Sequence, residues 1–99
     1  MSNATLAILG AGNIGRAIAT GLAGGLFQPA DIILTRRKPQ HLDDLTEAGF
    51  QVQSDNRDAV RRAEIIILTV EPQQLNPLLE EIADKIHDLQ RRVVQYSRT

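Results

Sequence analysis

The chain has 99 residues, with 11 basic and 12 acidic side chains and a formal net charge of −1. This length limits it to one compact domain, and the balanced charge argues against a nucleic-acid partner, which requires a basic face. No apolar stretch approaches the roughly 20 residues of a membrane span, and no secretory signal is visible. Because cysteine is absent, disulfides, thiolate metal sites and cysteine nucleophiles are excluded, and we expect a cytoplasmic location.

A glycine motif of the form G-x-G-x-x-G begins at Gly10, between an apolar run and a helix-like run. We expect a buried strand at Thr5–Leu9 and a helix at Asn13–Ala23, and together with the turn they form a pyrophosphate cradle. The first glycine allows the tight turn, Gly12 leaves room for the ligand, and Gly15 lets the helix lie close to the strand. We interpret the motif as dinucleotide-binding rather than as a plain tight turn. The expected contacts are Gly10, Gly12, Asn13, Ile14 and Gly15.

Strand-like and helix-like segments alternate through the rest of the chain. We expect strands at Asp31–Thr35, Phe50–Gln53, Ile65–Val70 and Arg92–Tyr96, and helices at Pro39–Ala48, from a cap at Ser54 or Asp55 to about Ala63, and from Pro72 onward. The unbroken apolar run of the 65–70 strand predicts burial on both faces. The last helix is expected to bury Leu75, Leu78, Leu79, Ile82, Ala83 and Ile86.

This alternation predicts an α/β fold: one Rossmann-type domain over residues 1–99, with a parallel sheet and helices on both faces. The expected strand order is 3-2-1-4-5, which reverses between the first and fourth strands. Ligands bind outside the carboxyl ends of the strands at such a reversal. We therefore predict a crevice lined by the glycine turn and by the segment after the fourth strand, with Thr69, Val70 and Pro72 as cofactor contacts.

The second strand ends in Thr35-Arg36-Arg37-Lys38, without the carboxylate that usually accepts a hydrogen bond from the ribose of NAD. A hydroxyl followed by cations suits the 2′-phosphate of NADP. Each charge-assisted hydrogen bond contributes about 1.5–3 kcal/mol, so one or two would favour NADP(H) over NAD(H) by roughly 10- to 1000-fold. We expect Arg36 and Arg37 to bind the phosphate and Lys38, before Pro39, to point away. A solvated basic turn is the alternative.

Arg16 lies in the first turn of the helix that follows the glycine motif. A cation there opposes the helix dipole unless an anion is close. A bound phosphate would supply that anion, but a solvated arginine is the simpler interpretation.

Three stretches, Gly10–Ala17, Ser54–Asn56 and Val70–Gln73, resemble the N-terminal domain of pyrroline-5-carboxylate reductases. The resemblance extends to about residue 90, although Glu71 stands where members usually have lysine. It implies NAD(P)H-dependent reduction of the cyclic imine 1-pyrroline-5-carboxylate to proline, in the last step of proline synthesis. It also implies that Asn56 contacts the adenosine ribose and that Thr35–Arg37 bind the 2′-phosphate.

Members of that family carry a second, helical domain that forms the dimer and most of the imine site, and these 99 residues do not contain it. Residues 91–99 also lack the small-residue loop expected after the fifth strand. We therefore expect a truncated cofactor-binding domain, inactive or nearly so alone, whose imine substrate and homo-oligomer depend on the missing domain.

No catalytic residue or metal ligand is predicted within the chain. His41, His87 and the pair Glu80-Glu81 are interpreted as surface or helix-end residues, because the histidines lack metal-ligand spacing and the glutamates lack a catalytic partner. Two alternatives stay open: the domain of another reductase, of hydroxyacid, prephenate or deazaflavin-linked type, or a non-catalytic nucleotide-binding module.

Overall fold

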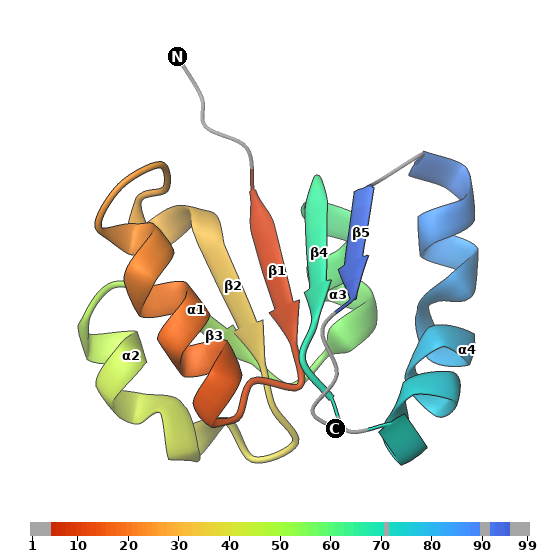
Figure 1. The fold of residues 1–99 in the computed structure, drawn as a ribbon, viewed down its shortest axis with the longest axis horizontal. Coiled ribbons are helices and arrows are strands. Elements are labelled where there is room, and N and C mark those ends of the chain that lie inside the picture. The colour runs from red at the N-terminus through yellow and green to blue at the C-terminus, as the bar shows by residue number, and fades with distance from the viewer. Residues whose placement is uncertain (1–4, 71, 90–91, 96–99) are drawn as a thin grey trace.

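The computed structural model describes residues 5–70, 72–89 and 92–95, and these form one parallel sheet with helices on both faces (Figure 1). The strand order is β3-β2-β1-β4-β5, which confirms the predicted order. All four strand pairs are parallel. The strands are β1 (Leu6–Leu9), β2 (Ile32–Thr35), β3 (Gln51–Gln53), β4 (Ile65–Leu68) and β5 (Arg92–Gln95).

Two helices cover each face of the sheet, as predicted. α1 (Asn13–Ala23) and α2 (Asp43–Glu47) lie on one face, in front of the sheet in Figure 1, and α3 (Asn56–Arg62) and α4 (Pro72–Leu89) belong to the other. Short 3₁₀ segments, Pro29–Asp31 before β2 and Pro39–Leu42 before α2, complete the connections. The carboxyl ends of β1, β2 and β4 meet at one edge, at the bottom of Figure 1.

Alternate residues of the central strands feed two separate cores. In β1, Leu6 and Ile8 pack beneath α1 and α2, whereas Ala7 and Leu9 face α3 and α4. Every residue of β1 and β2 is buried, as expected for strands that are covered on both sides. The position of the strand ends is therefore determined by packing on both faces.

β4 departs from its predicted double-sided burial. Ile66 and Leu68 are fully buried beneath α3 and α4, but Ile65 and Ile67 are only half-buried on the opposite face. The prediction was wrong on that face because α1 lies over β1 and β2, and α2 lies beside β3. The strand also ends at Leu68, two residues earlier than predicted, so Thr69 and Val70 follow it in the turn.

The helices that flank β3 resolve two further expectations. The predicted helix from Pro39 begins as a 3₁₀ turn, and only Asp43–Glu47 is α-helical. Gly49, with φ +105°, ends it. Of the two candidate caps for α3, Asp55 is the one used: its carboxylate accepts the backbone N–H of Asp58 at 3.1 Å.

α4 buries a narrower apolar face than its sequence predicts. Leu78 and Ile82 are buried, and Leu75 and Leu79 are half-buried against the same core. Ala83 was predicted on this face but is exposed; the buried residues of α4, Leu78 and Ile82, pack in the core that α3 and the sheet form. Among the residues that the structure describes, no helix is long and apolar enough to cross a membrane.

Several features named from the sequence lie outside the described residues. These are Glu71, Tyr96 and the tail after it, and the side chains of Pro72, Ile86 and His87.

Candidate functional site

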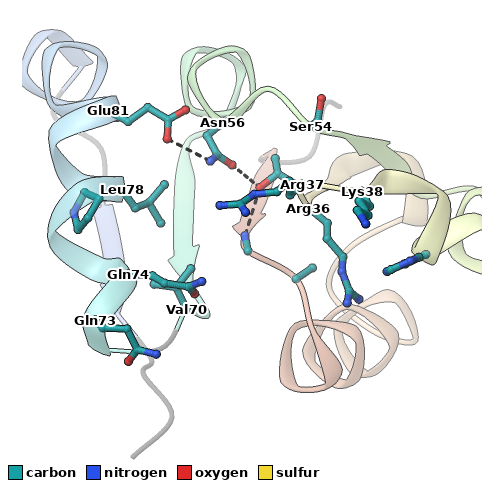
Figure 2. Close-up of a pocket in the computed structure, with 15 residues that line it drawn as sticks. Arg36, Arg37, Lys38, Ser54, Asn56, Val70, Gln73, Gln74, Leu78 and Glu81 are labelled. Atoms are coloured by element: carbon teal, nitrogen blue, oxygen red, sulfur yellow. Dashed lines mark hydrogen bonds between the residues drawn. The ribbon is translucent and has the colours of Figure 1, made fainter.

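A cleft of about 780 Å³ lies at the carboxyl ends of the strands, where the order reverses between β1 and β4. Its size is within the range of small-molecule sites, about 300–1,000 Å³. Five segments line it: the turn after β1, the end of β2 with its following loop, the segment around the start of α3, Val70 in the turn after β4, and the first three turns of α4. Figure 2 shows these segments converging from opposite sides.

The glycine turn is packed so tightly that two of its glycines cannot be replaced without movement. Gly10 has φ +76°, and a Cβ built on it would overlap Cγ1 of Val70. A Cβ on Gly15 would lie 3.2 Å from Ile8 Cγ2 and 3.2 Å from Thr69 Oγ1. These glycines therefore have structural roles, in the tight turn and in the close approach of α1 to β1.

Gly12 differs from its neighbours, because a Cβ built there would have no atom within 4 Å. Gly12 is the N-cap of α1, and no side chain caps this helix and no acidic residue lies in its first turn. The first N–H groups of such a helix have no partner within the helix and attract anions. The residues present therefore suit a phosphate group that approaches at Gly12.

The end of β2 is hydrogen-bonded to the glycine turn through Thr35. Its carbonyl oxygen accepts the N–H of Ala11 at 2.7 Å, and its Oγ1 accepts the N–H of Gly10 at 3.2 Å. The same hydroxyl donates to Oδ1 of Asn56, at the start of α3. Thr35 is 1% exposed, and it is the one buried polar residue among those described.

Three consecutive cations from the loop after β2 line the cleft. Arg36 is half-buried, and Arg37 and Lys38 are exposed. Within residues 5–70 and the described part of α4, none of the three forms an ion pair. Lys38 was expected to point away, but it lies on the cleft with the two arginines. No carboxylate follows β2 directly, so this end of the cleft is positively charged.

Arg16 is held by α2 rather than left for a ligand. Its guanidinium pairs with the carboxylate of Asp44 and donates to the carbonyl oxygen of His41 at 3.4 Å. The hydrogen bond from Arg16 keeps the pKa of Asp44 below its usual value of 3.8. Asp44, rather than a bound phosphate, is therefore the anion that pairs with Arg16 in this structure.

Several residues of α4 line the cleft, and the sequence analysis did not predict them as contacts. Glu81 was interpreted as part of the wet helix face; it is exposed, yet it lines the cleft and accepts a hydrogen bond from Asn56 Nδ2 at 3.4 Å. The signal was the helical spacing of Gln74, Leu78 and Glu81, which places them on one face. The lining residues not predicted as contacts, apart from Lys38, are Ala11, His41, Ser54, Gln73, Gln74, Pro77, Leu78 and Glu81.

The predicted contacts divide into those that line the cleft and those that do not. Gly10, Thr35, Arg36, Arg37, Asn56 and Val70 line it; Gly12, Asn13, Ile14, Gly15 and Thr69 are not among its lining residues, and the side chain of Pro72 lies outside the described residues. Thr69 instead donates its hydroxyl to the carbonyl oxygen of Leu9 at 3.0 Å. Gly12, the N-cap of α1, directly follows the lining residue Ala11 in the chain.

The strand order and the glycine turn at its reversal define a Rossmann-type nucleotide-binding domain. The sequence model described as "NADP oxidoreductase coenzyme F420-dependent" matches residues 5–94, and the chain belongs to this family.

Comparison with known proteins confirms the resemblance noted in the sequence. Pyrroline-5-carboxylate reductase 2 of Dictyostelium discoideum is 47% identical over 85 residues, which cover 82% of this chain and 28% of the relative. The structure of a pyrroline-5-carboxylate reductase from Coxiella burnetii superposes with a TM-score of 0.90 at 28% identity, covering 97% of this chain and 36% of that one. The Plasmodium falciparum pyrroline carboxylate reductase with NADP bound shares the fold, with a TM-score of 0.80 at 20% identity and coverage of 96% and 34%. The chain thus spans about a third or less of the length of these relatives.

Proposed function

We propose that this chain is the NADP(H)-binding domain of an oxidoreductase that reduces 1-pyrroline-5-carboxylate to proline. The observation that carries the cofactor choice is the cationic end of the cleft, where Arg36, Arg37 and Lys38 have no ion-pair partner among the described residues. Unlike Arg16, which is paired with Asp44, these side chains are available for a phosphate. The pyrroline-5-carboxylate reductases among its relatives support the choice of reaction.

Different residues of the site would bind different parts of the cofactor. The start of α1 at Gly12, with Asn13 and Ile14, would hold the pyrophosphate, and Arg36 and Arg37 the 2′-phosphate. Asn56 and the adjoining face of α4 would contact the adenosine. When bound, the reduced nicotinamide ring supplies the hydride for reduction of the C=N bond.

Catalysis, the imine substrate and a homo-oligomer belong in this proposal to the whole protein. The chain covers 28% of its Dictyostelium relative, so most of the protein that would hold the imine lies outside these residues. Fusion to the remaining part of that relative should yield NADPH oxidation that depends on 1-pyrroline-5-carboxylate. A fusion that folds and binds NADPH but stays inactive would favour a non-catalytic module. The cytoplasmic location is likewise a proposal, tested by cell fractionation.

Calorimetry with NADPH and NADH at one moderate salt concentration tests the cofactor assignment. We expect NADPH to bind at least about 10-fold more tightly, because one charge-assisted hydrogen bond contributes that factor. Arg36→Ala and Arg37→Ala should each remove about 10-fold of NADPH affinity and leave NADH affinity nearly unchanged. Arg57→Ala, which removes a charge from α3 outside the cleft, is the matched control. Equal losses for both cofactors would contradict the phosphate assignment.

A further inference from the structure

A chain of hydrogen bonds crosses the cleft and joins four separate segments (Figure 2). It begins on α4, where the carboxylate of Glu81 accepts from Asn56 Nδ2 at 3.4 Å. It continues from the start of α3 to the end of β2, where Thr35 donates its hydroxyl proton to Asn56 Oδ1. It ends in the glycine turn, with the N–H of Gly10 donating to Thr35 Oγ1 at 3.2 Å.

The directions of the two side-chain bonds follow from the carboxylate of Glu81, and the backbone N–H of Gly10 can only donate. An ionised carboxylate can only accept hydrogen bonds, so Asn56 turns its NH₂ group toward it. The amide oxygen of Asn56 then faces Thr35, whose hydroxyl has a single proton and donates it there. The lone pairs of that hydroxyl are left to accept the N–H of Gly10.

This arrangement leaves Thr35 without a proton for a phosphate. Its hydroxyl proton is used by Asn56, its oxygen is directed to Gly10, and the residue is 1% exposed. Phosphate oxygens are acceptors, so they need donors that this hydroxyl does not offer. The cations after β2 do offer donors. Binding of the phosphate and positioning of the glycine turn are therefore tasks of different residues.

We propose that Glu81 and Thr35 are positioning residues of the cofactor site, acting through Asn56 on the Gly10 turn. The inference rests on the proposed dinucleotide binding but assigns a different role from selection of NADP: the pair orders the turn for either cofactor. It also replaces the phosphate contact that the family resemblance implied for Thr35.

The test measures NADPH and NADH affinity for the 99-residue chain by calorimetry. Glu81→Leu removes the acceptor and should weaken both cofactors by the same factor, roughly 3- to 10-fold, as for one modest hydrogen bond. Glu81→Gln keeps an acceptor oxygen and should stay within about 2-fold of the wild type. Glu80→Leu, which removes the same charge from the neighbouring exposed position, is the control.

Thr35 provides an independent arm of the same experiment. Thr35→Val keeps the shape but removes both hydroxyl bonds, and should weaken NADPH and NADH equally, by roughly 10- to 30-fold. Thr35→Ser keeps the hydroxyl and should restore most of the affinity. Loss of NADPH binding alone in Thr35→Val would show a phosphate ligand and overturn the inference.

The amide resonance of Gly10 reports on the chain without any ligand. In ¹H–¹⁵N spectra it should shift in Glu81→Leu and return toward its wild-type position in Glu81→Gln. An unmoved resonance, or a gain in NADPH over NADH in Glu81→Leu, would overturn the inference. Failure of the wild type to bind either cofactor would refute the proposed function, while this resonance would still decide whether Glu81 orders the turn.

Discussion

Two walls of the cleft are built in opposite ways. The turn wall is one short segment, residues 10–15, of which Gly10 and Ala11 line the cleft; its conformation depends on the positive φ of Gly10 and on the close approach at Gly15. The composite wall consists of Thr35, Asn56 and Glu81, whose hydrogen-bonded neighbours are 21 and 25 residues apart in the chain. The first wall exists wherever its motif meets a strand and a helix; the second exists only when three elements have packed together.

In the proposed site, affinity for the dinucleotide and selectivity for NADP over NAD come from different parts of the cleft. In the proposed function, backbone N–H groups of the turn wall would bind the pyrophosphate of either cofactor. In the proposed function, the cations beside the composite wall, Arg36 and Arg37, would bind the 2′-phosphate that distinguishes NADP from NAD. Thr35 connects the two walls through its hydrogen bonds to Gly10 and Ala11. A substitution in one wall should therefore change the conformation of the other.

The largest expected effect comes from breaking the turn wall at Gly10. Gly10→Ala places a side chain at φ +76° and against Val70 Cγ1. Strain and overpacking together should lower the free energy of unfolding by about 2–5 kcal/mol, measured by urea denaturation. The double variant Gly10→Ala/Val70→Ala should recover about 1–2 kcal/mol relative to the additive sum, because the overlap is relieved. Strict additivity would mean that the packing against Val70 is unimportant.

Gly12→Ala should separate binding from folding within the same wall. Its Cβ meets no protein atom, so the free energy of unfolding should change by less than about 0.5 kcal/mol. The methyl group occupies the space where a phosphate would approach α1, and affinity for NADPH and NADH should fall by about 100-fold. Calorimetry and urea denaturation on one preparation check both statements. Retained affinity would place the pyrophosphate elsewhere.

Arg16→Gln should have a much smaller effect, although Arg16 directly follows the glycine motif. Its charge is answered by Asp44, so NADPH affinity should change by less than about 2-fold, in contrast to Arg36→Ala. Calorimetry of the two variants side by side measures the difference. A 10-fold loss in Arg16→Gln would instead make this arginine a phosphate ligand.

The smallest expected effect is the pH dependence of stability, to which two carboxylates, Asp58 and Asp44, contribute. The hydrogen bond from Gln53, followed by the one from Arg61, lowers the pKa of Asp58 in the first turn of α3, and the hydrogen bond from Arg16 lowers the pKa of Asp44 in α2. A carboxyl group whose pKa is lower in the folded state stabilises the fold above its unfolded pKa. This stabilisation is lost as the pH falls through the folded pKa, below 3.8.

Urea midpoints measured from about pH 7 down to about pH 3 should therefore decline on acidification. Asp58→Asn and Asp44→Asn should each make that decline shallower, with no change in its direction. A decline as steep in both variants as in the wild type would assign the acid sensitivity to other groups.

Much of the fold follows from local patterns, and its exceptions have packing causes. The strand order, the bounds of α1 and the capping of α3 at Asp55 all agree with short-range signals. The half-buried face of β4 and the exposed Ala83 do not, because burial depends on which helix lies over which strand. Apolar composition alone cannot specify that arrangement.

The sequence by itself predicted the glycine turn and the positive charge of the loop after β2. A glycine motif after an apolar strand predicts a tight turn, and consecutive cations after β2 specify local charge. The contacts of Gly10 with Val70 and Thr35 are added by the fold. Only the tertiary structure decided that Arg16 is occupied by Asp44, that Lys38 faces the cleft, and that Glu81 reaches Asn56. The Arg16–Asp44 and Asn56–Glu81 contacts join residues far apart in the chain, and the position of Lys38 on the cleft likewise depends on how the elements pack.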